Sequence, residues 1–131
     1  MNNKELCLKA YEAMKNAYAP YSDFKVGAAL LTKSGKVYTG CNIENASFTP
    51  TVCAERVAIF KAVSEGEREF SKIAVAGGKN GEISSVCPPC GVCRQVLSEF
   101  CGPDFEVLFV LGNGKYETHT LGELLPHSFK V

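Results

Sequence analysis

The clustering of cysteines constrains this chain more than any other feature of its sequence. Three of the seven cysteines lie in the segment Cys87-Pro88-Pro89-Cys90-Gly91-Val92-Cys93, and the other four are Cys7, Cys41, Cys53 and Cys101. An odd number of cysteines, without a recognisable secretion signal, argues against a framework of disulfide bonds. In a reducing compartment, clustered thiols more often bind a metal or take part in chemistry. The sequence therefore favours a fold in which some of these thiols form a metal or reactive site.

Two cysteine motifs stand at the beginnings of two predicted helices. Cys53 lies near the start of a helix expected over residues 52–63, and Cys90 and Cys93 lie at the start of a helix expected from about 91 to 100. Sulfurs at positions i and i+3 share one side of a first helical turn, as a tetrahedral metal requires. Helix N-termini also favour the thiolate over the thiol. Cys53, Cys90 and Cys93 are therefore predicted to hold Zn²⁺ and to leave its fourth position open, as catalytic zinc sites do.

Glu55 and Arg56 follow Cys53 closely and supply the other groups that such a site needs. A carboxylate beside the metal can take a proton from an activated water and pass it to a substrate. Residues two apart do not share a helical face, so Cys53 and Glu55 converge only if Cys53 precedes the regular helix. Three thiolates outweigh the charge of one Zn²⁺. Arg56 is predicted to offset that excess by donating hydrogen bonds to the thiolates.

Two other interpretations of the cysteines remain open. Cys87 could be a fourth ligand, which would make the zinc site closed and structural, although a Cys-Pro-Pro segment does not easily turn back onto the same metal. Cys90 and Cys93 could instead form a redox pair, but the strand and turn that precede a thioredoxin-like motif are missing. Cys7, Cys41 and Cys101 are most simply small hydrophobic residues of the core.

Hydrophobic periodicity predicts an α-ββ-α-β-α-ββ-α order of elements. The Asn113-Gly114 pair marks a tight hairpin, and the central strand–helix–strand segment should be a right-handed parallel crossover. The prediction is a three-layer α/β/α fold over residues 1–131, one domain with a mixed five-stranded sheet and helices on both faces. Expected helices cover residues 4–17, 52–63, 91–100 and 121–125, and expected strands cover 25–32, 36–43, 72–76, 105–111 and 116–120. Gly77-Gly78 should end the third strand, and Phe60 should be buried.

Charge and hydropathy exclude several classes of partner. Lys and Arg number 14 and Asp and Glu number 14, so the formal net charge is zero and no excess attracts nucleic-acid phosphates. No apolar run reaches the roughly 18–20 residues that cross a bilayer. The N-terminal segment carries charges within its apolar pattern and has no signal-peptide core. We therefore expect a cytoplasmic protein that binds neither nucleic acid nor membrane.

The two motifs and several further segments resemble one enzyme family. Thr51-Val52-Cys53-Ala54-Glu55-Arg56 and Pro89-Cys90-Gly91-Val92-Cys93-Arg94-Gln95 match the signature of zinc deaminases, in which a glutamate that is not a ligand acts as acid and base. Similar segments include Tyr18-Ala19-Pro20-Tyr21-Ser22, residues 24–30, residues 40–46 and Leu124-Leu125-Pro126. Over nearly its whole length the chain resembles the small, homotetrameric class of cytidine deaminases.

The resemblance implies roles for residues outside the metal motif. Asn42 and Glu44 would bind the ribose hydroxyls, and the carboxylate of Glu44 would repel a 5′-phosphate, which favours a nucleoside over a nucleotide. Phe24 would pack against the flat pyrimidine ring. Ala54 would be a further substrate contact. Glu55 would be the catalytic residue in the hydrolytic deamination of cytidine and 2′-deoxycytidine, with one Zn²⁺ per subunit, in pyrimidine salvage.

The resemblance also implies a homotetramer with shared active sites. Phe48 and Phe129 would contact the site of a neighbouring subunit. Phe48 stands where many relatives carry Tyr, and His127 stands where relatives often carry Gly. Both departures concern the predicted subunit contacts and leave the metal motif intact.

Other activities are compatible with the metal motif alone. A deaminase of blasticidin-type antibiotics shares the motif, although the pair Asn42 and Glu44 favours a ribose. A polynucleotide editor is disfavoured by the zero net charge. A non-enzymatic zinc module would bind metal but would release no ammonia from cytidine.

Overall fold

The computed structural model describes residues 1–131, and its elements follow the predicted order. The helices are α1 (Asn3–Met14), α2 (Ala54–Ser64), α3 (Gly91–Phe100) and α4 (Leu121–Leu124). The strands are β1 (Phe24–Thr32), β2 (Val37–Cys41), β3 (Phe70–Lys79), β4 (Glu106–Gly112) and β5 (Lys115–Thr120). None of the helices has the length and apolar character needed to cross a membrane.

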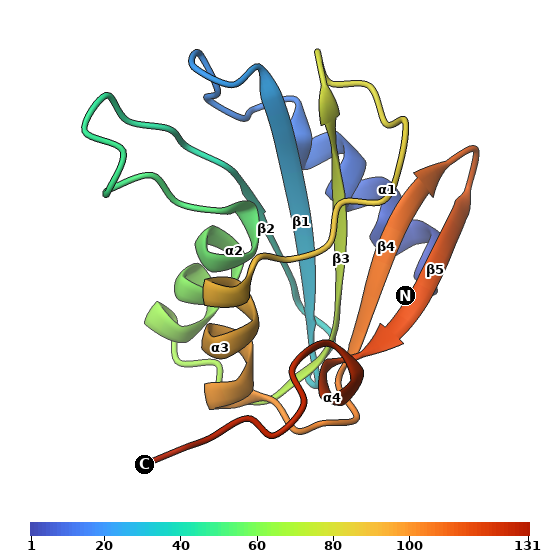
Figure 1. Cartoon of the computed structure of the whole chain (residues 1–131). Helices are drawn as coiled ribbons and strands as arrows, with labels where there is room; N and C mark the ends of the chain where they lie inside the picture. The colour runs from blue at the N-terminus through green and yellow to red at the C-terminus, as the bar shows by residue number, and fades with distance from the viewer.

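The five strands form one mixed sheet in the order β2-β1-β3-β4-β5 (Figure 1). β1 pairs antiparallel with both β2 and β3, and β4 pairs antiparallel with β5. β3 and β4 are parallel, and α3 lies between them in the chain. The predicted hairpins and the predicted parallel crossover are therefore confirmed.

Helices cover both faces of the sheet, as predicted. In Figure 1, α1 lies behind the sheet, whereas α2 and α3 lie in front of it. Alternate residues of β1 point to opposite faces of the sheet. Ala28 and Leu30 belong to the core under α2 and α3, and Ala29 belongs to the core under α1. Gly27 allows the close approach of α1, since a Cβ there would lie 2.1 Å from the backbone oxygen of Ala10.

The first helix is shorter than predicted. α1 begins at Asn3, where the side chain of Asn2 accepts a hydrogen bond from the Glu5 N–H group, and it ends at Met14. The amides of Asn16 and Ala17 bond to carbonyls three residues back, at Ala13 and Met14. This tighter turn ends the α-helix before Ala17.

The prediction that β3 ends at Gly77-Gly78 was wrong. The strand continues to Lys79, with Gly77 and Gly78 paired to β1. Glycine is needed here because neighbours approach closely, not because the strand stops: a Cβ on Gly78 would lie 1.7 Å from the backbone oxygen of Glu82. The predicted burial of Phe60 was also wrong, since its side chain is 49% exposed.

The segment after β2 brings a loop to the start of α2. Ile43 forms isolated bridges with Tyr18 on one side and Val52 on the other. Backbone hydrogen bonds of 3.0 Å join Ile43 and Val52 in both directions. β2 itself ends at Cys41. Asn42 and Glu44 flank Ile43, so these bonds hold both residues next to the start of α2.

Candidate active site

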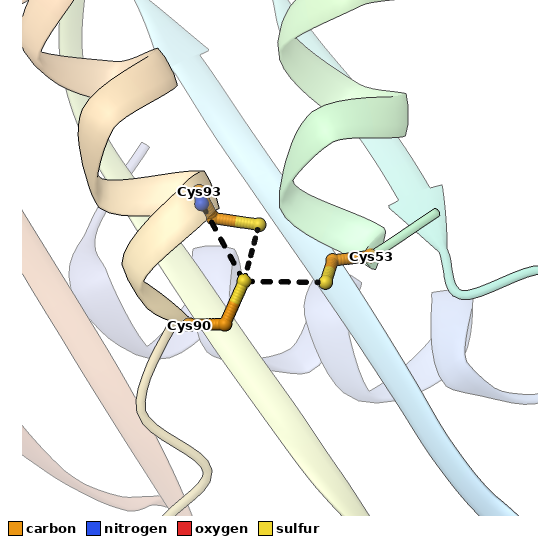
Figure 2. Close-up of side chains that lie close together, drawn as sticks. All are labelled: Cys53, Cys90 and Cys93. Carbon is orange, nitrogen blue, oxygen red and sulfur yellow. Dashed lines mark hydrogen bonds between the residues drawn. The ribbon is translucent and has the colours of Figure 1, made fainter. Parts of the chain in front are cut away.

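The thiols of Cys53, Cys90 and Cys93 converge between the starts of α2 and α3. Figure 2 shows the three side chains pointing toward one another, with 3.5 Å from the Cys90 sulfur to each of the Cys53 and Cys93 sulfurs. All three sulfurs lie within 4.8 Å of one another. Cys53 is the N-cap of α2 and Cys90 is the N-cap of α3, both with extended backbone. Cys53 therefore precedes the regular helix, as its predicted convergence with Glu55 requires.

The spacing of the three sulfurs suits a zinc ion. With Zn–S bonds of about 2.3 Å, tetrahedral geometry places two ligand sulfurs about 3.8 Å apart. Two of the observed separations are 3.5 Å and the third is within 4.8 Å, which is close to that value, and the donor set is one that zinc prefers. Cys87 does not belong to the converging group. The interpretation as a closed site with four cysteines therefore lacks its fourth sulfur. A zinc ion held by the three converging thiols alone would keep a position for a solvent molecule or a substrate.

Arg56 contacts the sulfur cluster, as the sequence predicted. Its Nη2 donates a hydrogen bond of 3.4 Å to the sulfur of Cys53. Hydrogen bonding with the Cys93 thiol, and then with Arg56, lowers the pKa of Cys53 to about 5. Nε of Arg56 is buried without a hydrogen-bond partner, so this guanidinium retains an unused donor beside the cluster.

Glu55 is a buried carboxyl group in the first turn of α2. Its side chain is only 3% exposed, and Oε1 has no hydrogen-bond partner within the chain. A buried acceptor without a hydrogen-bond partner costs free energy. A bound ligand that donates a hydrogen bond to Glu55 would recover that free energy, which makes the carboxyl group a candidate binding group. Burial, and then the neighbouring charge of Cys53, raises the pKa of Glu55 to about 7. A carboxyl group with such a pKa can both accept and donate a proton near neutrality.

Asn42 is held by the first residues of β1, and Glu44 is held by the turn that precedes this strand. The Oδ1 atom of Asn42 accepts a 2.8 Å hydrogen bond from the Val26 N–H group, and its Nδ2 donates one of 2.8 Å to the Phe24 carbonyl. Glu44 accepts hydrogen bonds from the N–H groups of Tyr21 and Ser22 and from the Ser22 hydroxyl. These bonds, that from the Ser22 hydroxyl foremost, lower the pKa of Glu44. Both side chains keep spare hydrogen-bonding capacity for a polar ligand.

Three aromatic residues of the predicted site lie on the surface of the single chain. Phe24 begins β1 and is 37% exposed, while Phe48 and Phe129 are 71% and 69% exposed. The ring of Phe48 packs edge to face on that of Tyr21, at 6.2 Å between centroids. Ala54, in contrast, is fully buried at the start of α2. The fold of one chain therefore leaves Phe48 and Phe129 uncovered.

Sequence reasoning missed two residues that hold the site in place. Ser22 fixes the carboxylate of Glu44, and Arg94 bridges two loops by donating to the carbonyl of Pro89 at 2.8 Å and to that of Leu124 at 2.7 Å. Arg94 directly follows Cys93, so its place in the motif was a usable signal. Nothing in the local pattern around Ser22 indicated its contact with Glu44, 22 residues away.

Cavity size does not identify this site. A cavity of about 460 Å³ is lined by α1, by Glu82 and Ile83, and by the β4–β5 hairpin. It contains none of the three converging cysteines and no Glu55. The chemistry of the side chains, not the size of a cavity, marks the candidate active site.

Comparison with known proteins agrees with this geometry. Residues 1–109 match the family model described as the cytidine and deoxycytidylate deaminase zinc-binding region. The cytidine deaminase of Halalkalibacterium halodurans is 49% identical over 131 residues, covering 98% of this chain and 95% of that protein. The blasticidin-S deaminase of Bacillus cereus is 41% identical over 112 residues, covering 81% of this chain and 79% of that protein.

A solved structure shares both fold and sequence. The crystal structure of cytidine deaminase from Burkholderia pseudomallei superposes with a TM-score of 0.90 at 46% identity, covering 98% of this chain and 100% of that one. The resemblance that the motifs indicated is thus confirmed. With its converging thiols placed for Zn²⁺ and its match to the family model over residues 1–109, the chain belongs to the zinc-binding cytidine and deoxycytidylate deaminase family.

Proposed function

We propose that residues 1–131 form one cytidine deaminase domain that converts cytidine and 2′-deoxycytidine to the corresponding uridines. In this reaction water adds to C4 of the pyrimidine, the C4–N bond breaks and ammonia leaves. One observation carries the proposal: three converging thiols lie beside a buried carboxyl group, that of Glu55, which has an oxygen without a partner. The names of the relatives support the same substrate class.

Glu55 is the proposed acid and base of the reaction. Cys53, Cys90 and Cys93 would hold Zn²⁺, which would supply a Lewis acid that makes water a competent nucleophile near neutral pH. Glu55 would accept one proton of the water and deliver it to N3 of the ring; it would then take the proton of the hydroxyl group added at C4 and give it to the departing amine, so that both protons of the water are transferred. Burial suits it to this cycle, because it raises the pKa of the carboxyl group to about 7.

Four residues are proposed to bind the nucleoside. Phe24 packs against the pyrimidine, and Ala54, between a metal ligand and Glu55, is a further contact. Asn42 and Glu44 bind the ribose hydroxyls with the hydrogen-bonding capacity that their contacts to the chain leave free. An ionised Glu44 favours a neutral diol and repels a 5′-phosphate, so the substrate is a nucleoside.

Glu44→Gln should raise KM for cytidine about tenfold, because a hydrogen bond to a charged acceptor is worth about 1.5–3 kcal/mol. The amide of Gln keeps one acceptor for the Tyr21–Ser22 turn. Steady-state kinetics with cytidine and with 2′,3′-dideoxycytidine measure the effect. The second substrate lacks both hydroxyls, so its KM should not change. An equal rise in KM for both substrates would contradict the role of Glu44 at the ribose.

Arg56 is proposed to stabilise the zinc-bound thiolates through its contact with Cys53. Arg56→Ala should weaken zinc affinity about 10- to 100-fold, the usual effect of removing a partner of a metal ligand. Competition with a chromogenic chelator measures the affinity, and the pH–rate profile should shift as well. Arg68→Ala, which removes an exposed guanidinium bonded only to backbone carbonyls, is the matched control. Unchanged zinc affinity and an unchanged pH–rate profile in Arg56→Ala would refute this role.

The protein is proposed to be a homotetramer with shared active sites. The exposure of Phe48 and Phe129 in the single chain supports this proposal, since large apolar groups favour burial in an interface. Sedimentation should give the mass of four chains, and Phe129→Ala should weaken the assembly and raise KM together. A monomer at the concentration used in the assay, with full activity, would contradict the shared site.

The proposed setting is pyrimidine salvage in the cytoplasm. All seven cysteines are free thiols, which suits a reducing compartment. A nucleoside substrate without phosphate is the kind of compound that salvage reactions recover. Neither a nucleic acid nor a membrane is proposed as a partner.

A panel of substrates tests the proposed function. Purified protein should release ammonia from cytidine and 2′-deoxycytidine, with uridines as products by chromatography, and should act far more slowly on cytidine 5′-monophosphate. Blasticidin S and single-stranded DNA test the two other substrate classes. Preferred turnover of blasticidin S would replace the proposal with the antibiotic activity, and zinc binding without ammonia release would replace it with a zinc module.

A further inference from the structure

We infer that Cys87 is a specificity-determining residue, which limits the substituents that the pyrimidine ring of a substrate can carry. This inference rests on the proposed function, because it assigns a role at the same site. Cys87 is the one thiol of the Cys87–Cys93 segment that does not join the converging sulfurs. Its position, and not its capacity to bind metal, gives it a function.

The thiol of Cys87 meets the proposed ring-binding residue at Gly77. A Cβ atom built on Gly77 would lie 2.7 Å from the sulfur of Cys87 and 3.1 Å from Cε1 of Phe24. Sulfur and ring edge therefore border the same point, within the range in which sulfur and an aromatic ring attract each other. Glycine at position 77 is what allows them to meet.

The same thiol lies near the reacting groups. After burial, the charges of Glu55 and Cys53 are the causes that raise the pKa of Cys87, to about 12. The side chain is thus a neutral thiol throughout the range in which an enzyme works. It forms a small uncharged wall beside the edge of Phe24, within electrostatic reach of the Glu55 carboxyl group.

The backbone holds this wall in place. Two prolines follow Cys87, and each fixes its own φ angle and restricts the residue before it. Pro89 is fully buried and its carbonyl accepts a hydrogen bond from Arg94. A rigid side chain excludes ring substituents that are too large for the site, whereas a flexible one would move aside for them.

The ring carbons are the positions that such a wall can sense. In the proposed reaction, Glu55 protonates N3 and the C–N bond breaks at C4. Asn42 and Glu44 bind the ribose that is attached to N1. C5 adjoins C4, and a substituent there adds volume without altering the reacting bond. One methyl group in a tight apolar site changes the relative kcat/KM about 10- to 200-fold.

The test compares kcat/KM for 5-methylcytidine with that for cytidine in variants of known side-chain size. Cys87→Ala should raise this ratio about tenfold over the original chain, and Cys87→Leu should lower it about tenfold. Cys87→Val is the milder substitution if the leucine variant does not fold, and it should lower the ratio less. Cys41→Ala, which removes a half-buried thiol on β2, is the matched control and should leave the ratio unchanged.

Zinc content separates this role from a ligand role. Each Cys87 variant should keep the zinc content per chain of the original protein. A ratio that does not follow side-chain size, or a loss of zinc in Cys87→Ala, would overturn the inference while leaving cytidine deamination intact. A wild-type protein that releases no ammonia from cytidine would instead overturn the proposed function, and this inference with it.

Discussion

Glu55→Gln should lower kcat for cytidine by about 10²- to 10⁴-fold, the usual contribution of a general acid–base. The amide keeps the size and shape of the side chain but can neither accept the proton of water nor return it. Zinc binding should persist, because Glu55 is not among the converging thiols. The fall in ultraviolet absorbance as cytidine is consumed gives kcat, and atomic absorption gives the zinc content.

Glu99→Gln is the matched control for this variant. Glu99 is an exposed residue of α3 with no hydrogen bond or ion pair from its side chain, so its amide should leave kcat, KM and zinc content unchanged. An active Glu55→Gln enzyme that retains its zinc would refute the role of Glu55. The same result would leave the fold and the metal centre as described.

Cys93→Ala should abolish stoichiometric zinc binding and, with it, deamination. Its sulfur is fully buried in the first turn of α3, so no exposed group can replace it. A ligand present at 1,000 times its Kd stabilises a fold by about 4 kcal/mol, so loss of the metal should lower Tm by about 15 °C. Differential scanning calorimetry with and without added zinc measures this shift.

Cys101→Ala is the control that separates loss of a ligand from loss of a buried thiol. Cys101 lies in the core below α3 but is not one of the converging thiols. Its replacement should cost about 1 kcal/mol through a small cavity and should leave zinc content unchanged. Equal loss of zinc in both variants would show that Cys93 acts through packing and is not a ligand.

The order of elements was predictable because its signals are local. Alternating and helical patterns of apolar residues and the Asn113-Gly114 turn each act within one element, and the structure confirms the sheet that they imply. The end of β3 was not predictable. Gly77 and Gly78 resemble a strand terminus in sequence, but they are required by neighbours at positions 82 and 87 that the fold brings close.

The same distinction applies to the site. The spacing of Cys90 and Cys93, and the Cys-Ala-Glu-Arg motif that begins at Cys53, are short motifs whose chemistry can be interpreted directly, and the three thiols do converge. The contact of Ser22 with Glu44 and that of Arg94 with Leu124 join residues far apart in the chain. Such contacts depend on tertiary packing, which a pattern of residue types does not encode.

Phe60 illustrates a further limit of pattern reasoning. An apolar residue at helical spacing was predicted to face the core, yet it lies exposed on α2. Ala58, Ile59 and Ala62 are fully buried, so the face of α2 that carries these three residues packs on the core. Two alanines and Ile59 thus define the buried face of α2, and Phe60 lies outside it.

Titration of metal-free protein with Zn²⁺ tests the central claim most directly. Three thiols that hold one catalytic ion predict that cytidine turnover rises in proportion to added zinc and stops rising at one equivalent per chain. Turnover that is undiminished in metal-free protein, or a saturated zinc site without any turnover of cytidine, would contradict the account.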